Sequence, residues 1–184
     1  MATKTRWEID PIHTEITFKV KHLMIANVKG VFTDYKAIIY TNGDDFLTAD
    51  VDFWMDPESL ETKDKQRDQH LKSIDFFETE KYKEITFRSN TIESVDGDGS
   101  FTLWGDLTIK GITKRVKLDV EFGGVITDPW GTKKAGFTIN GDISRKDWGL
   151  TWNTALETGG VLVGDKVHIS CDVELVKADE LVEE

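Results

Sequence analysis

The chain has 184 residues, which suits one domain with its own hydrophobic core. Hydrophobic residues make up 39% and charged residues 31% of the chain, an ordinary balance for a globular protein. A net charge of −11 argues against nucleic acid as a partner, because binding it requires clustered Lys and Arg that release counterions. We expect one domain over residues 1–184, with a core at 7–177 and an acidic tail at 178–184.

The first part of the chain alternates apolar and polar residues, the pattern of a strand with one buried face. Ile16, Phe18 and Val20 share one face of such a run. Residues 42–45, Asn-Gly-Asp-Asp, have the composition of a hairpin turn. The patterns predict strands at residues 13–21, 28–41 and 46–55.

Residues 56–84 interrupt the alternation with a charged segment. Within it, residues 64–73 have the composition of a short helix. Leu71, Ile74 and Phe77 follow at a spacing of three, which predicts that all three pack against the strands.

Alternation then resumes and continues almost to the end of the chain. It predicts strands at residues 85–94, 100–109, 112–126, 134–144 and 166–177. Residues 145–165 form an irregular stretch rich in Gly and Trp. Cys171, the one cysteine, lies on the apolar face of the last strand, so we interpret it as a buried small side chain rather than a nucleophile.

Eight antiparallel strands with one apolar face each can close into a barrel, which removes the sheet edges. A barrel of eight strands is either just filled by its own side chains or leaves room for one small ligand. The Phe-rich inner faces fit both possibilities, so the composition does not choose between them.

Several charged residues invite a catalytic interpretation, but their spacing favours a structural one. Arg67 and Asp68 are adjacent, so on a helix their side chains point in different directions. We expect Arg67 to pair with a carboxylate elsewhere and to fasten the helix over the strands, and we interpret Arg145 in the same way. The chain has no Gly-x-Ser-x-Gly elbow, no phosphate loop and no His-Glu-x-x-His pattern. The sequence therefore predicts no catalytic residue, no metal site and no cofactor.

Four motifs occur in order along the chain. They are Trp-Glu-Ile-Asp-Pro-Ile-His at 7–13, Arg-Asp-Gln-His-Leu at 67–71, Gly-Asp-Leu-Thr-Ile-Lys-Gly-Ile-Thr at 105–113 and Ile-Ser-Arg-Lys-Asp-Trp-Gly at 143–149. Together they resemble the signature of the YceI-like, polyisoprenoid-binding family over residues 7–176. At 82–87 the chain lacks the proline that usually follows the tyrosine in this family, which is a detail of one turn.

The resemblance implies an all-β fold: a single eight-stranded, antiparallel, lipocalin-like barrel with an elongated apolar cavity. The short helix then lies between the third and fourth strands. It also implies a homodimer and a lipid ligand: a polyisoprenoid, an isoprenoid quinone or a similar long-chain amphiphile. We expect the protein to carry, store or sequester this lipid. Two alternatives stay open: an enzyme acting on such a lipid, and a filled barrel with a structural or interaction role.

Inward-facing residues of the expected barrel are candidate ligand contacts, although core packing explains each position equally well. Trp148 and Trp152 suit either a plug or an entrance at a barrel end. His22 and Met24 belong to an apolar lip at 22–25 or to a simple loop contact. The full set of candidates is Phe18, Val20, His22, Met24, Phe32, Phe53, Phe87, Leu103, Leu107, Val120, Phe122, Phe137, Ile143, Trp148 and Trp152.

No secretory signal precedes Trp7, and no stretch reaches the roughly 18 apolar residues that a membrane span needs. As given, the chain is expected in the cytoplasm. The resemblance allows a second possibility, because family members often carry a periplasmic signal, and a chain trimmed of one would read the same.

Overall fold

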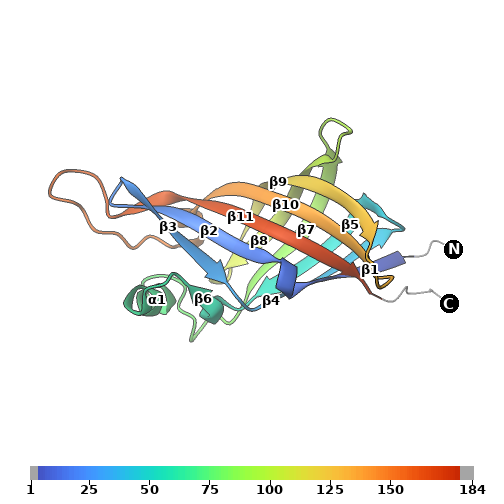
Figure 1. The fold of residues 1–184 in the computed structure, drawn as a ribbon. Coiled ribbons are helices and arrows are strands. Elements are labelled where there is room, and N and C mark those ends of the chain that lie inside the picture. The colour runs from blue at the N-terminus through green and yellow to red at the C-terminus, as the bar shows by residue number, and fades with distance from the viewer. Residues whose placement is uncertain (1–3, 179–184) are drawn as a thin grey trace.

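The computed structural model describes residues 4–178, and most of them lie in β-strands. Antiparallel pairing follows the order β1–β4–β5–β7–β8–β9–β10–β11, and β1 also pairs with β11, which closes the ring (Figure 1). The predicted eight-stranded antiparallel barrel is therefore confirmed. The predicted acidic tail lies outside the described residues except for Ala178.

The strands are β1 (Lys4–Ile9), β2 (Glu15–His22), β3 (Ala26–Phe32), β4 (Tyr35–Asn42), β5 (Asp45–Met55), β6 (Leu60–Glu61), β7 (Ile85–Ser94), β8 (Ser100–Ile109), β9 (Ile112–Thr127), β10 (Lys133–Ser144) and β11 (Val163–Lys177). The helices are the 3-10 turns η1 (Pro11–His13), η2 (Pro57–Ser59) and η3 (Arg145–Trp148), and one α-helix, α1 (Lys65–Lys72). Among the described residues, no helix is long and apolar enough to cross a membrane.

Strand β9 illustrates how the alternating pattern builds the wall. Val116, Leu118 and Val120 are buried, and Lys117 and Asp119 between them are exposed. Each strand therefore has one dry and one wet face, as a sheet with one buried side requires. The dry faces of all eight strands of the ring point into the barrel.

Two of the predicted strands differ from the structure near the N-terminus. The strand expected at 13–21 corresponds to β2 and omits β1. Strand β1 pairs with the last residues of β11, η1 then interrupts the pairing, and β2 resumes it along the rest of β11. The strand expected at 28–41 is broken at Thr33 and Asp34 into β3 and β4. The break at Thr33 and Asp34 is stabilised by residues distant in the chain. Asp56 donates its N–H to the Asp34 carbonyl at 2.9 Å, and Thr33 donates its N–H to the Ser59 hydroxyl. Such contacts leave no local signal in the sequence.

Helix α1 and its flanks cover one end of the barrel. Asp64 caps the helix by accepting the N–H groups of Gln66 and Arg67. Leu71 and Phe77 pack against the core as predicted, but Ile74 is 73% exposed and Phe76 is buried in its place. The prediction for Ile74 was wrong because the helix ends at Lys72, so the spacing of three does not continue beyond it.

At the opposite end of the barrel, where β1 begins and β11 ends (Figure 1), aromatic side chains gather in a cluster that we call the aromatic plug. We use this name for Trp7, Phe46, Phe122 and Phe137. Trp7 is fully buried and donates its indole N–H to Thr41 at 2.8 Å. The Phe46 ring lies 5.0 Å from the ring of Trp7 and 4.9 Å from that of Phe137. The four side chains pack together at this end of the barrel.

Candidate functional site

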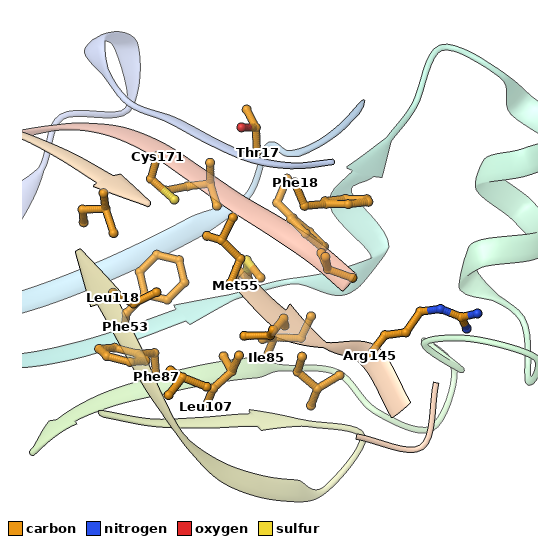
Figure 2. Close-up of a pocket in the computed structure, with 18 of the residues that line it drawn as sticks. Thr17, Phe18, Phe53, Met55, Ile85, Phe87, Leu107, Leu118, Arg145 and Cys171 are labelled. Atoms are coloured by element: carbon orange, nitrogen blue, oxygen red, sulfur yellow. The ribbon is translucent and has the colours of Figure 1, made fainter. Parts of the chain in front are cut away.

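The barrel encloses a cavity of about 600 Å³ between the aromatic plug and helix α1. All eight strands of the ring contribute to its wall, and Figure 2 shows Phe18, Met55, Ile85 and Leu107 among the side chains that surround it. Small-molecule sites span roughly 300–1,000 Å³ and are mostly apolar. The barrel is therefore not filled by its own side chains, and its hollow has the size and chemistry of a ligand site.

Two glycines help to keep the interior open. A Cβ added at Gly30 would collide with the ring of Phe18, the residue opposite it on β2. A Cβ added at Gly105 would collide with the ring of Phe87 and lie 2.7 Å from the Arg88 carbonyl oxygen. The two phenylalanine rings therefore lie close against the backbone of the neighbouring strand, where a larger residue would displace them.

Most of the predicted contact residues border this cavity. Those that line it are Phe18, Val20, His22, Phe32, Phe53, Phe87, Leu103, Leu107, Val120, Phe137, Ile143 and Trp152. Their position is established by the structure, and their contact with a ligand stays a prediction.

The other three candidates lie elsewhere. Met24 is 58% exposed and its sulfur packs against Gly160, because the turn after β2 meets the loop before β11. Phe122 belongs to the aromatic plug, with its ring stacked 5.1 Å from that of Phe137. Trp148 is buried in the hydrophobic core, where its indole N–H donates to the Leu107 carbonyl at 2.9 Å. Alternation predicts which side chains point into the barrel, but it does not tell whether an inward side chain lines the cavity or belongs to the aromatic plug.

Part of the cavity wall lies outside the predicted set of residues. Apolar lining residues outside the predicted set include Val51, Met55, Leu118, Ile169 and Val173. The same alternation would have found them, because each lies on the dry face of a predicted strand. Charged lining residues such as Lys21 and Arg67 gave no such signal, since their role depends on which ends of the strands meet α1.

We call the part of the cavity at α1 the helix end. Here the ring of His70 lies 4.5 Å from that of Trp152 and 5.1 Å from that of Phe76, edge-on to both. The Nε2 atom of His70 also lies 2.9 Å from a carboxylate oxygen of Asp75. These contacts connect helix α1 to the loop before β11 at this end of the cavity.

Arg67 fastens α1, but with a partner different from the expected one. Its Nε donates to the Thr62 hydroxyl at 2.8 Å and its Nη2 donates to the Thr62 carbonyl. The Asp68 carboxylate accepts hydrogen bonds from the Thr62 amide and hydroxyl. The helix is therefore tied to the residue that follows β6, and the predicted carboxylate partner of Arg67 is replaced by Thr62.

Arg145 borders the helix end and is almost completely buried, with 3% of its surface exposed. Its guanidinium donates to the carbonyls of Leu150, Trp152, Val163 and Gly164. Burial lowers the pKa of this guanidinium, and the nearby Asp165 opposes the shift. The side chain clamps the loop after η3 against the start of β11, so its structural role is confirmed without a direct carboxylate partner.

Comparison with known proteins places this barrel in a family. The model of the YceI-like domain matches residues 7–175. The chain belongs to the YceI-like family. A UPF0312 protein of Staphylococcus aureus is 38% identical over 171 residues, which cover 92% of this chain and 96% of the relative. The resemblance drawn from the sequence motifs is thereby confirmed.

Solved structures show the same YceI-like fold. The YceI protein of Campylobacter jejuni has a TM-score of 0.72 at 34% identity, covering 90% of this chain and 91% of that one. BcnA of Burkholderia cenocepacia has a TM-score of 0.77 at 20% identity, covering 90% and 98%. A polyisoprenoid-binding domain of Saccharophagus degradans has a TM-score of 0.65 at 14% identity, covering 94% and 98%. At the two lower identities the likeness concerns the fold alone.

The middle of this YceI-like cavity carries one ionisable side chain, Cys171. Cys171 is 7% exposed, and burial raises the pKa of its thiol to about 12. The thiolate is the nucleophilic form, so Cys171 is inert near neutral pH. Its interpretation as a buried small side chain is confirmed.

Proposed function

We propose that this YceI-like protein binds a long apolar lipid in its barrel, with the tail directed toward the aromatic plug. A polyisoprenoid, an isoprenoid quinone or a similar amphiphile fits this description. The observation that carries the proposal is the apolar cavity of about 600 Å³, walled by all eight strands. The Saccharophagus degradans domain of the same fold is described as polyisoprenoid-binding, which supports the same class of ligand.

Burial of the tail supplies most of the expected affinity. Each CH₂ group removed from water contributes about 0.8 kcal/mol, so a few isoprene units suffice for tight binding. The wall between the plug and the helix end is built from side chains such as Val51, Phe53, Leu107 and Leu118. Such a wall distinguishes tails by length and girth rather than by polar chemistry, which suits a carrier, a store or a scavenger.

The geometry favours binding over catalysis. General acid–base or nucleophilic chemistry needs an activated group at the reacting atom. Among the side chains that line the described cavity, the Cys171 thiol is neutral, and the guanidinium groups of Arg67 and Arg145 hold backbone carbonyls. The Nε2 atom of His70 is held by Asp75. The homodimer and the cytoplasmic location stay predictions, which light scattering and cell fractionation would test.

The proposal is tested by extracting the purified protein with organic solvent and identifying the extract by mass spectrometry, followed by titration with an isoprenoid quinone. We expect a co-purified lipid or saturable uptake of the quinone. A protein that yields no lipid and takes up no quinone contradicts the proposal.

A pair of tryptophan variants locates the site. Val51→Trp adds bulk to the cavity wall, whereas Leu47→Trp adds it to an exposed position on the same strand. We expect Val51→Trp to reduce quinone uptake at least about tenfold, because the ring occupies space that the tail needs. Leu47→Trp should bind like the wild type. Equal uptake by both variants would place the ligand outside the barrel.

A further inference from the structure

The turn between β2 and β3 presents apolar side chains to solvent. Leu23, Met24 and Ile25 are exposed, Ile25 at 84% of its surface. Val161, in the loop before β11, is exposed as well. We call these four residues the hairpin tip. Single exposed apolar residues are common on protein surfaces, whereas a group of them in adjoining segments is typical of a surface that contacts a partner or a membrane.

Contacts between the two segments hold the hairpin tip together. The Leu23 N–H donates to the Leu162 carbonyl at 2.9 Å, and a Cβ added at Gly160 would collide with the sulfur of Met24. Figure 1 shows the turn after β2 and the loop before β11 at the end of the barrel where α1 lies. The tip is therefore one surface built from two segments that are distant in the chain.

The backbone of the turn is unfavourable for the side chains that it carries. The Ile25 N–H donates to the His22 carbonyl at 3.3 Å, and the two residues between them have positive φ, 53° at Leu23 and 65° at Met24. Such turns favour Asn-Gly, because positive φ crowds a bulky side chain. Elsewhere in residues 4–178, positive φ outside glycine occurs only at charged residues. Strain of this kind is typical of functional segments.

The strands that lead to the tip carry lysines and no carboxylates. From residue 16 to residue 33 the chain has Lys19, Lys21 and Lys29 but neither Asp nor Glu, although 34 of its 184 residues are acidic. All three lysines are exposed. Lys19 lies directly opposite Lys29 in the register of β2 and β3, where the two like charges repel each other. Among residues 4–178, neither Lys19 nor Lys21 forms an ion pair.

The carboxylates nearest to these strands lie away from the tip or are engaged. Glu15 begins β2 and Glu61 pairs with the end of β3, so both lie at the base of the hairpin. On the neighbouring strands, Asp165 accepts the Ser144 hydroxyl at 2.6 Å and Asp142 contacts His168. Beyond about 8 Å charges are screened at physiological ionic strength, so the lysines of the hairpin govern attraction at its tip rather than the net charge of the molecule.

The hairpin tip adjoins the cavity. His22 immediately precedes the tip and Leu162 follows Val161, and both line the cavity. A lipid that leaves the cavity between these residues reaches the apolar tip before it reaches open water. Exposure of a long tail to water is unfavourable, so a barrel whose opening touches a bilayer exchanges such a lipid more easily than one in free solution.

We infer that the hairpin tip docks on a lipid bilayer that contains anionic lipids. Leu23, Met24, Ile25 and Val161 enter the membrane interface, and the lysines of β2 and β3 contact the anionic head groups. Apolar side chains flanked by lysines are the pattern of interfacial membrane binding. The inference names the partner that delivers or receives the lipid, and in this respect it rests on the proposed function. Docking of the empty protein does not depend on it.

Sedimentation with vesicles tests the docking. We expect the protein to bind vesicles of equal parts phosphatidylcholine and phosphatidylglycerol, and to bind more weakly when the vesicles contain phosphatidylcholine alone or when salt is added. Ile25→Ser should weaken this binding about tenfold, because it removes an inserted apolar side chain. Ile12→Ser is the matched control, since Ile12 is 86% exposed but lies in η1, at the other end of β2. Absence of vesicle binding, or an equal loss in both variants, overturns the inference.

A second variant separates docking from folding. Leu23→Asn combined with Met24→Gly gives the turn the residues that its backbone favours and removes two apolar side chains. We expect a urea midpoint at or above that of the wild type, together with vesicle binding weakened at least about tenfold. If the midpoint falls instead, Ile25→Ser decides, because Ile25 lies outside the two strained positions. A wild-type dimer that this variant converts into a monomer would show that a second copy covers the tip, which overturns the inference.

A fluorescent label shows which end of the barrel enters the bilayer. Cys171 is inert near neutral pH, so an environment-sensitive dye attaches to the thiol introduced by Ile25→Cys or by Ile12→Cys. We expect anionic vesicles to shift the emission of the dye at position 25 to the blue and to leave that at position 12 unchanged. A shift at position 12 alone, or at neither position, contradicts docking through the tip.

Lipid transfer distinguishes this inference from the proposed function. Isoprenoid quinone supplied in anionic vesicles should enter the wild type at least about tenfold faster than Ile25→Ser. At equilibrium both should bind the quinone equally, because Ile25 does not line the cavity. Equal rates overturn the role of the tip in transfer and leave the lipid binding intact. Vesicle binding without any uptake of quinone supports the docking and contradicts the proposed function.

Discussion

Gly30 determines how closely the ring of Phe18 lies against the cavity wall. A Cβ at this position would collide with that ring. We expect Gly30→Ala to push Phe18 into the cavity, lowering lipid uptake and reducing the free energy of unfolding by about 1–3 kcal/mol. Denaturant titration and quinone uptake measure the two effects.

Gly136→Ala is the matched control for this prediction. Gly136 also lies on a strand of the barrel, and a Cβ added there meets no atom within 4 Å. It should therefore change stability and uptake little. If the Gly30 and Gly136 variants behave alike, the ring of Phe18 has room that the structure does not show.

Asp10 gives the protein a pH-dependent contact at the junction of β1 and β2. Its carboxylate accepts a hydrogen bond from the Ile12 amide and lies 2.8 Å from Nδ1 of His13. The Lys134 ammonium forms ion pairs with both Asp10 and Glu174. The hydrogen bond with His13 holds the pKa of Asp10 below its usual 3.8. A carboxyl whose pKa is lowered in the folded state stabilises the protein above its unfolded pKa and loses that contribution as the pH falls through the folded pKa.

Asp10→Asn keeps an oxygen that can cap η1 and removes the charge. We expect a loss of roughly 0.5 kcal/mol near neutral pH, because the group is close to solvent. The difference from the wild type should shrink as the pH falls below 3.8. Urea unfolding across the acid range checks this, and a constant difference at every pH would show that the charge of Asp10 is not involved.

At the scale of elements, Arg145 organises the junction of η3, the following loop and β11. It connects the carbonyls of four residues on two segments that the sequence pattern left irregular. Arg145→Gln leaves some of these buried acceptors unpaired, so we expect a loss of at least about 2 kcal/mol in unfolding free energy. Limited proteolysis should show faster cleavage within residues 150–162.

Lys146→Gln is the control for this change, because Lys146 is the next residue on η3 and is exposed. It removes the same charge without touching the four carbonyls. Equal proteolysis of the two variants would contradict the clamp.

For the molecule as a whole, the reactivity of the Cys171 thiol measures how often the barrel opens to solvent. Its thiol lines the cavity, and burial raises its pKa to about 12. A thiol reagent at mildly alkaline pH should therefore react at least about a hundredfold more slowly with the folded protein than with the unfolded one. A bound lipid should slow the reaction further, because it stabilises the closed state and covers the thiol. Rapid labelling of the folded protein would show instead that solvent reaches the middle of the barrel.

Local sequence patterns were enough to predict most of the strands and their inward faces. Alternation with a period of two is a local property, so the strands at 85–94 and 100–109 were predicted with the bounds that the structure gives. The same property identified wall residues such as Phe87 and Leu107, because it states which side chains point inward. The family motifs added the closed, eight-stranded barrel.

Whether the barrel is hollow, and which charged residues border its cavity, depends on contacts made in the folded chain. Knowing that a side chain points inward does not tell how much space the inward side chains leave. That space depends on the ring of Phe18 lying over Gly30 and the ring of Phe87 lying over Gly105, each on a neighbouring strand. The break between β3 and β4 and the exposure of Ile74 depend likewise on contacts between residues distant in the chain. The helix end brings together Lys21, Arg67 and Arg145, which no local pattern connects. Alternation acts between neighbours along one strand, whereas a cavity and its charge arise from elements that meet only in the folded chain.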